Sequence, residues 1–236
     1  MKTAVERHAV ATAPFDRPEE YDAILSRGIR LSGEGKLFFI EGRLADMRRR
    51  LPAGWAPRRI LDFGCGTGDT TAALKRVFPA AYVVGLDAAA TALASARAAH
   101  ASAGVTFADV GSLGASQAFD LCYVNGVFHH IAPAERLSAA AMIREALTPR
   151  GLLVLFENNP WNPGTRMVMS RIAFDRNAQT LTVFEARRLL YAAGFRTCSA
   201  GRFLFYFPNA LRVLRVVEPW LVRVPLGAQY WVMAAK

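Results

Sequence analysis

Residues 59–70 read RILDFGCGTGDT, a short apolar run followed by three glycines at alternate positions. A dinucleotide-binding loop of the form G-x-G-x-x-G would need a third glycine where this chain has Asp69. A pyrophosphate at the following helix would face the carboxylates of Asp62 and Asp69, and a Walker loop would need Gly-Lys-Ser/Thr after the glycines. The loop therefore favours a ligand with a cationic group and no phosphate.

Downstream of this loop, short apolar runs alternate with alanine-rich stretches of helical spacing. Near-continuous apolar strands separated by helices are typical of a parallel sheet that is covered on both faces. We therefore predict a doubly wound α/β fold for residues 58–236, with two last strands in FRTCSAGRFLFYF and AQYWVMAA. The runs that carry this prediction are RILDF, AYVVGLD, VTFAD, FDLCYV and LLVLFE.

The flanking regions follow other patterns. Residues 1–57 are predicted to form a helical N-terminal cover, with Ser32 capping its second helix. Residues 157–181 are predicted to be a long polar connection, which ends at the capping box of Thr182 and Glu185. Residues 208–226 are predicted to form a lid-like segment between the last two strands.

The composition excludes several protein classes. The first residues, MKTAVERHAV, lack the apolar stretch of a signal peptide, and no window holds eighteen uninterrupted apolar residues. Cys65, Cys122 and Cys198 have no C-x-x-C spacing, which argues against a disulfide framework and a structural zinc site. We therefore expect a cytoplasmic protein with reduced thiols, and we assign no metal ligands.

The net charge of +10 is concentrated in the C-terminal third. Residues 151–236 carry eleven basic and four acidic side chains, and the arginines alternate with apolar residues. The stretch LRVLRVVEPWLVRVPL has two interpretations. It forms a basic, apolar surface for a hydrophobic acceptor or an anionic membrane, or its arginine stems simply cover a core-facing stripe.

The glycine loop and the strand ends after it resemble class I S-adenosylmethionine-dependent methyltransferases of the bacterial small-molecule type. Motif I of that family matches residues 59–70, and the resemblance extends over about residues 20–235. It implies a seven-stranded Rossmann-like methyltransferase fold and S-adenosylmethionine as cofactor. It also implies the cofactor-binding residues Tyr21, Asp62, Gly64, Cys65, Gly66, Thr67, Gly68, Asp87, Ala88, Asp109, Val110, Asn125 and Gly126.

Methyl transfer from a sulfonium needs mainly positioning, but a hydroxyl acceptor also needs a base. The resemblance places His129 and His130 beside the transferred methyl group, so both are candidate catalytic residues. The alternative is that one of them packs or caps the next turn.

The segment ENNPWNPGTR, residues 157–166, contains a partial match to the Asn-Pro-Pro-Trp motif of amino-group DNA methyltransferases. Asn159 replaces the first proline, and the segment follows the fifth strand rather than the fourth, so DNA methylation is disfavoured. Loops at the carboxyl ends of parallel strands nonetheless bind ligands. The substrate-side candidates are Glu157, Asn158, Asn159 and Trp161, and the alternative is a turn stiffened by prolines.

These patterns predict an enzyme that transfers a methyl group to a small-molecule acceptor, which can be hydrophobic or lipid-linked. Two alternatives stay open: a nucleic-acid methyltransferase, and a cofactor-binding protein without catalysis. The charge pattern adds a peripheral membrane contact through the C-terminal segment. The sequence leaves the acceptor, the methylated atom and the oligomeric state undetermined.

Overall fold

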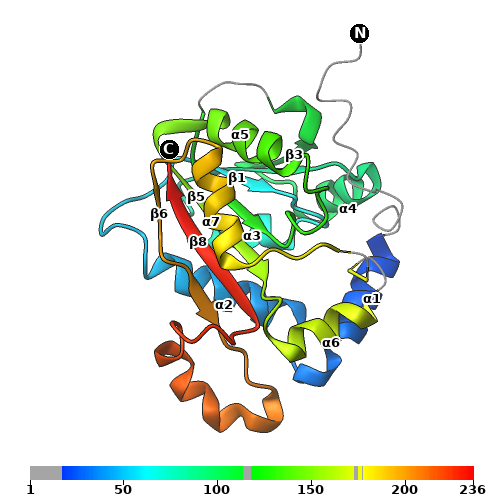
Figure 1. The fold of residues 1–236 in the computed structure, drawn as a ribbon. Helices are drawn as coiled ribbons and strands as arrows, with labels where there is room; N and C mark the ends of the chain where they lie inside the picture. Colours follow the sequence, from blue (N-terminus) through cyan, green and yellow to red (C-terminus); the bar gives the residue numbers. More distant parts are fainter. Residues whose placement is uncertain (1–17, 114–117, 173–174, 177) are drawn as a thin grey trace.

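The computed structural model describes residues 18–113, 118–172, 175–176 and 178–236, without the side chains of residues 18–22 and Leu31. An eight-stranded sheet with the order β3-β2-β1-β4-β5-β8-β6 runs through the centre, and β7 pairs with β8 (Figure 1). Strands β1 to β5 are parallel, while β8 is antiparallel to β5. The strands are β1 Arg59–Phe63, β2 Tyr82–Asp87, β3 Val105–Asp109, β4 Phe119–Asn125, β5 Leu147–Asn158, β6 Thr197–Cys198, β7 Arg202–Leu204 and β8 Gln229–Ala235.

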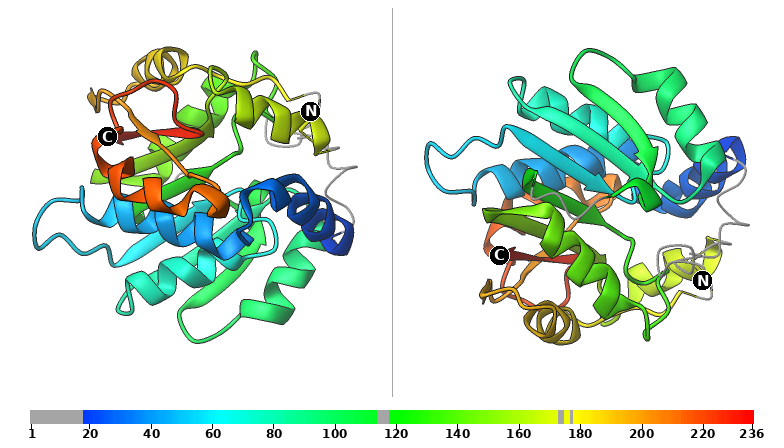
Figure 2. Two further views of the ribbon diagram at one scale, coloured as in Figure 1. Left: turned by 90° about the horizontal axis from the view of Figure 1, so that it is seen from below. Right: turned by 90° about the horizontal axis from the view of Figure 1, so that it is seen from above.

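Helices cover both faces of this sheet (Figure 2). Helices α2 and α3 pack in a cluster on one face, and α5 and α7 pack in a cluster on the other. The helices are α1 Pro18–Ile29, α2 Lys36–Arg48, α3 Asp69–Val77, α4 Ala90–His100, α5 Arg136–Ala146, α6 Pro163–Arg171 and α7 Val183–Ala192, with the 3₁₀ helices η2 Arg30–Ser32, η3 Val110–Ser112 and η4 Asn209–Trp220.

The central strands are apolar on both sides because successive side chains point to opposite faces. In β1, Ile60 joins the cluster of α2 and α3, and its neighbour Leu61 joins the cluster of α5 and α7. In β4, Tyr123 and Cys122 divide in the same way, and all four side chains have no exposed area. The predicted doubly wound α/β fold is confirmed.

One predicted strand is divided in two. The stretch FRTCSAGRFLFYF forms β6 and β7, which both pair with β8, so the sheet has one strand more than the seven expected. Gly201 lies between them with φ +88°, and a Cβ there would lie 2.4 Å from Val183 Cγ2. The chain turns at this glycine, where helix α7 approaches too closely for a side chain.

The predicted connection at residues 157–181 contains helix α6. Asn162 caps it, since its Oδ1 accepts a hydrogen bond from the Thr165 amide at 2.7 Å, and proline stands in its first turn. Asparagine followed by proline is a helix start as well as a turn signal, so the sequence pattern was ambiguous.

The expected cap at Ser32 is wrong, because α2 begins after Gly35. Ser32 Oγ instead donates to the Ile29 carbonyl at 2.6 Å and accepts from the Glu34 amide at 3.1 Å, which ends the first helical segment. The capping box of Thr182 and Glu185 at α7 is confirmed.

The predicted N-terminal cover is continuous with the core. Ile40, Leu44 and Met47 of α2 are buried in the same cluster as Tyr123 and Phe156 of the sheet. Residues 1–17 of the predicted cover lie outside the described residues. Within the described part of the chain, no helix is both long and apolar enough to span a membrane.

Candidate functional site

The loop of Gly64 to Gly68 joins β1 to α3 and is held by its backbone. The amides of Gly64 and Cys65 both donate to the Leu86 carbonyl, at 2.7 and 2.9 Å. Gly64 has φ +77°, and a Cβ there would lie 2.3 Å from Val127 Cγ2. Only glycine combines this backbone conformation with this close approach, so the ends of β1, β2 and β4 meet at the loop.

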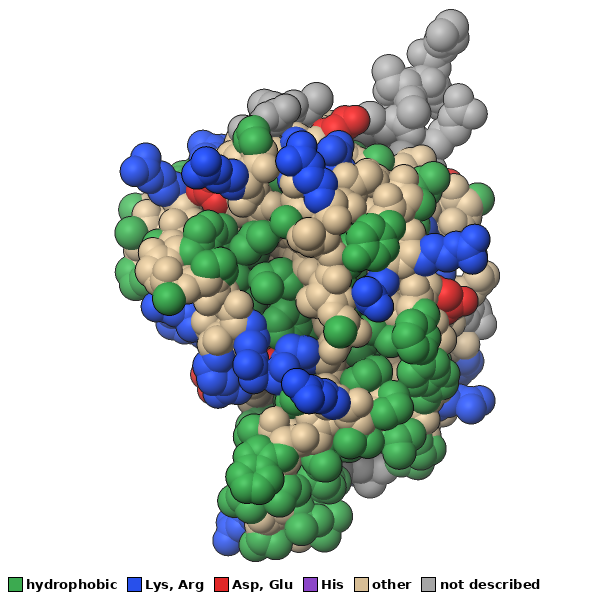
Figure 3. Space-filling model, turned by 60° about the vertical axis from the view of Figure 1, so that its left-hand side comes forward, with side chains coloured by type: hydrophobic (Ala, Val, Ile, Leu, Met, Phe, Trp, Pro, Cys, Tyr) green, Lys and Arg blue, Asp and Glu red, His purple; other side chains and the backbone are tan. Residues whose placement is uncertain are grey.

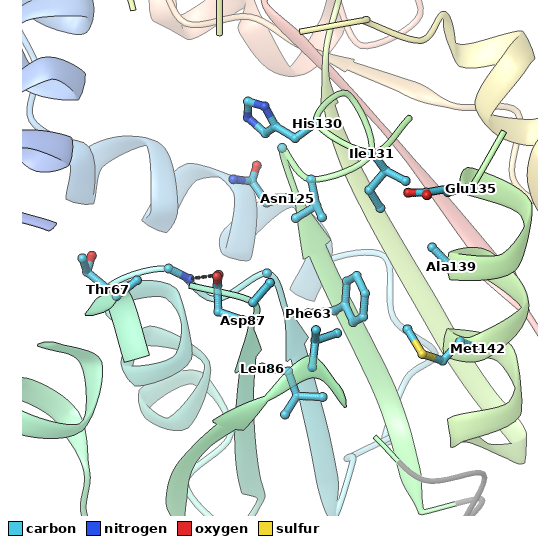
Figure 4. Close-up of a pocket in the computed structure, with 17 residues that line it drawn as sticks. Phe63, Thr67, Leu86, Asp87, Asn125, His130, Ile131, Glu135, Ala139 and Met142 are labelled. Carbon is cyan, nitrogen blue, oxygen red and sulfur yellow. Dashed lines mark hydrogen bonds between the residues drawn. The ribbon is translucent and has the colours of Figure 1, made fainter. Parts of the chain in front are cut away.

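Asp87 at the end of β2 connects the loop to the next strand. Its Oδ2 accepts a hydrogen bond from the Gly66 amide at 2.7 Å, drawn in Figure 4, and its Oδ1 accepts from the Ala89 amide at 2.9 Å. Burial raises the pKa of Asp87, and these amide donors oppose that rise. Each carboxylate oxygen has a further acceptor site, so the side chain can accept a pair of ligand hydroxyls.

A cavity of about 120 Å³ lies over these strand ends. Figure 4 shows Thr67 and Asp87 on one side of it and Met142 of α5 on the other, with Phe63 and Leu86 between them. The cavity is thus polar at the loop and apolar toward α5. The predicted cofactor-binding residues that line it are Gly64, Gly66, Thr67, Asp87, Ala88, Val110, Asn125 and Gly126.

Three predicted cofactor residues do not line this cavity. Asp62 is 2% exposed and accepts a hydrogen bond from Thr71 Oγ1 at 2.6 Å. Burial raises the pKa of Asp62 to about 7, which the Thr71 hydrogen bond opposes. Gly68 is the N-cap of α3, and Asp109 is exposed and accepts from the Gly111 amide at 2.7 Å. These residues shape the loop and the strand ends behind the cavity wall.

Two further residues, Cys65 and Tyr21, were also predicted to bind the cofactor. Cys65 lines a second, larger cavity, and burial raises the pKa of its thiol far above the usual range. A thiol with so high a pKa is not a nucleophile at neutral pH. Tyr21 belongs to α1, but its side chain lies outside the described part of the chain.

The larger cavity has a volume of about 590 Å³ and shares a wall with the smaller one. Its outer walls come from α1, α2, α6 and residues 205–208. Most of these walls are apolar: Leu25, Ile29, Phe39, Met167, Ile172, Phe205, Phe207 and Leu226. The residues common to both cavities are Gly64, Gly66, Thr67, Asn125, Gly126 and His130.

His129 is part of a buried ion-pair cluster. It is 3% exposed, its Nδ1 lies 2.5 Å from Glu157 Oε2, and its Nε2 lies 3.5 Å from Asp175 Oδ1. Burial alone would lower the pKa of His129, but the charges and hydrogen bonds of Glu157 and Asp175 raise it to about 10. His129 therefore carries a proton at neutral pH, and it is unsuited to accept another.

His130 is the candidate base that the cavities share. Its Nε2 lies 3.2 Å from Asp175 Oδ1, and it lines both cavities. A histidine that a carboxylate orients at the reacting position is suited to remove a proton. Asp175 lies in a polar stretch without hydrophobic periodicity, and no pattern in the sequence pointed to it.

The same cluster contains the donor set of a metal site, although the sequence assigned no metal ligand. His129, His130 and Asp175 each offer one ligand atom, and these atoms lie within 4.8 Å of one another. A proton on His129 occupies the ring nitrogen that would bind a metal ion. The positive charge of the ring also offsets part of the negative charge of Glu157 and Asp175.

The substrate-side candidates after β5 divide between the two faces of the sheet. Asn158 lines the larger cavity, as expected, and its Oδ1 accepts from Gln229 Nε2 at 3.1 Å. Glu157 points to the opposite face because β5 continues through it, paired with Tyr230 of β8. Glu157 has no exposed area and accepts from the Phe128 amide at 2.8 Å, so it holds the loop after β4.

The other two candidates after β5 do not line either cavity. Asn159 is 1% exposed, and its Nδ2 donates to the carbonyls of Pro225 and Gly227. The ring of Trp161 packs beside those of Phe184 and Phe203. Both side chains support the ENNPWNP turn, which agrees with the alternative interpretation of that segment.

Two cations near the loop are further residues that the sequence reading missed. Lys36 Nζ lies 2.5 Å from Asp69 Oδ2 and 2.9 Å from Thr67 Oγ1, so α2 is attached to the glycine loop. Arg43 is 7% exposed, and it donates to the hydroxyl of Tyr123 and to Gln229.

The chain is similar in sequence to known methyltransferases. Residues 60–151 match the protein family described as a methyltransferase domain. Trans-aconitate 2-methyltransferase of Methylobacterium nodulans is 37% identical over 136 residues, which cover 55% of this chain and 49% of that protein. The enzyme of the same name from Escherichia coli O1:K1 / APEC is 30% identical over 118 residues, 50% of this chain and 46% of that protein. The chain spans about half the length of these curated relatives.

The fold is similar to solved structures over almost the whole chain. An S-adenosylmethionine-dependent methyltransferase from Thermotoga maritima, described as a possible histamine N-methyltransferase, has a TM-score of 0.65 at 18% identity. The comparison covers 95% of this chain and 99% of that structure. Residues 60–151 thus contain a methyltransferase domain, and the fold around it, with a glycine loop that lines a cavity at the strand ends, is the fold of solved S-adenosylmethionine-dependent methyltransferases.

Proposed function

We propose that the protein transfers a methyl group from S-adenosylmethionine to an oxygen atom of a small, largely apolar acceptor. The observation that carries the proposal is the wall common to the two cavities, which contains the glycine loop, Asn125, Gly126 and His130. Methyl transfer requires the donor and acceptor atoms to lie about 3–3.5 Å apart and in line. A donor in the smaller cavity and an acceptor in the larger one would meet at this wall.

The smaller cavity supports S-adenosylmethionine as the donor through three features. Asp87 offers two carboxylate oxygens for the ribose hydroxyls, and Met142 and Phe63 offer apolar surface for the adenine. Asn125 Oδ1 is buried without a hydrogen-bond partner among the described residues. A buried acceptor without a partner is costly, and the ammonium group of the methionine moiety would satisfy it.

The larger cavity supports an apolar acceptor with a hydroxyl group. Its cations are already paired, since Lys36 contacts Asp69 and Arg43 donates to Tyr123 and Gln229. The rest of its outer wall is mostly apolar. His130 would accept the proton of the hydroxyl as the oxygen attacks the methyl carbon, and Asp175 would hold the ring in place.

Sequence similarity favours a second candidate, the methylation of a carboxylate. The relatives from Methylobacterium nodulans and Escherichia coli are both trans-aconitate 2-methyltransferases. A carboxylate oxygen is already deprotonated at neutral pH, so this reaction needs no base. The two candidates therefore differ in whether turnover depends on His130.

Turnover with labelled S-adenosylmethionine tests both candidates. The protein is incubated with long-chain phenols and alcohols in one set and with trans-aconitate in another. We expect turnover in the first set, and His130→Gln should lower kcat by about 10²–10⁴-fold while the Kd of the cofactor is unchanged. His100→Gln is the matched control, because His100 pairs with Asp69 but does not line either cavity.

Three results would contradict the proposal. Turnover of trans-aconitate alone, with His130→Gln as active as the wild type, would establish the second candidate. Cofactor binding without turnover in either set would indicate a protein that binds the cofactor without catalysis. The absence of calorimetric binding of S-adenosylmethionine and of its demethylated product at millimolar concentration would refute both candidates.

A further inference from the structure

Residues 209–226, here called the foot, carry the most exposed apolar side chains of the described chain. Val213, Val216 and Trp220 are 74%, 76% and 85% exposed, and no residue of η4 is buried. Figure 3 shows a predominantly hydrophobic projection at the lower end of the molecule, where Figure 1 has η4. The other exposed apolar residues of the foot are Leu211, Leu214, Val217, Val224 and Leu226.

The foot is attached to the body through side chains of η4 and through the backbone carbonyls of Val222 and Leu226. Arg215 Nη2 pairs with Glu34 Oε1 at 2.8 Å, and its guanidinium lies 4.6 Å from the centre of the Phe38 ring. Glu218 Oε1 accepts from the Phe207 amide at 2.7 Å. The interpretation in which arginine stems cover a core-facing stripe therefore accounts for Arg215. It does not account for Val213, Val216 and Trp220, which lie on the outer side and are exposed. That outer side is not part of the core.

Basic side chains gather beside the foot. Burial lowers the pKa of Arg202, the charge of Asp46 opposes this, and the nearby charges of Arg50 and Arg223 lower it further. In Figure 3 a band of Lys and Arg lies directly above the hydrophobic projection. The foot itself contains a single acidic residue, Glu218, which is hydrogen-bonded to the backbone. The apolar projection is therefore bordered by positive charge.

We propose that the foot docks on an anionic membrane surface. Val213, Val216 and Trp220 would enter the boundary between headgroups and acyl chains, and the basic band would contact the lipid phosphates. An apolar surface bordered by Arg is the pattern of a segment that lies in the membrane interface, where tryptophan is favoured. A second copy of the chain fits less well, because a two-fold contact through the foot would bring two basic bands together.

The foot also reaches the larger cavity. Its last residue, Leu226, lines the cavity wall, and so do Phe207 and Pro208 directly before its first residue. Docking would therefore hold this wall close to the membrane. Resting on the proposed function, this position favours an acceptor whose hydroxyl-bearing head is attached to a membrane-embedded acyl or isoprenoid chain.

Sedimentation with vesicles tests the docking. We expect the full chain to bind vesicles of phosphatidylcholine with 30% phosphatidylglycerol at low salt, and to be released at 0.5 M salt. Val213→Ser/Val216→Ser should weaken this binding at least tenfold. Leu137→Ser/Phe184→Ser, at exposed apolar positions on α5 and α7, is the matched control and should bind as the wild type does. Arg212→Glu/Arg223→Glu should weaken binding about fivefold per charge removed.

Fluorescence locates the contact at the foot. In a Trp161→Phe background, Trp220 is the most exposed tryptophan, and its emission should shift to the blue on binding and be quenched by brominated lipid. Absence of binding at low salt, or equal binding by the foot variant and its control, would overturn the proposal. A dimer that is lost in Val213→Ser/Val216→Ser, without vesicle binding, would identify a second copy instead. Unchanged cofactor affinity in the foot variants separates these results from a failure of the proposed function.

Discussion

The two cavities are built in different ways. The smaller one is lined by the ends of β1, β2 and β4 together with α5, all within residues 63–142. The larger one takes its outer walls from α1, α2, α6 and residues 205–208, which lie far apart in the sequence. The first follows from a general property of parallel sheets, whose carboxyl ends meet at one edge. The second depends on how the covering segments pack.

The family similarity follows the same division. The match at residues 60–151 contains every residue that lines the smaller cavity. It ends before α6 and the foot, and it begins after α1 and α2. The matched domain thus contains the smaller cavity, whereas α1, α2, α6 and residues 205–208, which form the outer walls of the larger cavity, lie outside it. Three substitutions separate the two sides experimentally.

The largest effect is expected for Glu157→Gln, which acts on the cluster between the two sides. Glu157 has no exposed area, and it holds His129 and the Phe128 amide. Removal of its charge leaves the buried imidazolium with less compensation, which costs about 3–5 kcal/mol of unfolding free energy at pH 7. Urea unfolding measures this loss. The exposed Glu145→Gln is the control and should leave stability unchanged.

The same variant should change the pH dependence of stability. The pKa of His129 is raised to about 10 in the folded protein, above its ordinary value of about 6.5. Its stabilising contribution is therefore complete below pH 6.5 and is lost as the pH rises through 10. Wild-type stability should fall over this range, and Glu157→Gln should fall less steeply. Equal slopes would mean that Glu157 does not hold the proton on His129.

A smaller effect, confined to the donor side, is expected for Asp87→Ala. The substitution removes the acceptor for the Gly66 amide and for the ribose hydroxyls, and we expect the Kd of S-adenosylmethionine to rise about 10–100-fold. Asp109→Ala is the matched control, because Asp109 pairs in register with Asp87 but does not line the cavity. Calorimetry should show less than a twofold change for the control. An equal loss of S-adenosylmethionine affinity in both variants would mean that Asp109 also contributes to cofactor binding.

The smallest effect is expected for Gly28→Ala on the acceptor side. A Cβ at Gly28 would lie 2.5 Å from Ile172 Cγ1, where α1 approaches the end of α6. Alanine in a helix usually stabilises by about 0.5–1 kcal/mol, but here we expect a loss of about 1 kcal/mol. The KM of the acceptor should rise, and the Kd of the cofactor should stay constant. Gly35→Ala has no atom within 4 Å of its Cβ and serves as the control.

The residues whose position in the fold the sequence located are those at strand ends. Asp87 and Asn125 could be located because apolar runs mark where each strand stops, and both line the smaller cavity. Glu157 was predicted on the substrate side, but β5 extends through it in pairing with β8, and the alternation of the strand turns its side chain inward. Asp175 could not be predicted, since its relation to His130 depends on a contact between distant segments.

The sequence by itself determined the sheet, the glycine loop and the class of donor, because periodicity and backbone requirements are local properties of the chain. The tertiary structure alone decided which histidine lines both cavities, which of the residues after β5 reach them, and that the arginine-rich segment projects from the body. These features arise where segments separated by many residues pack together. Packing depends on the shapes and charges of both partners, and a linear pattern shows only one of them.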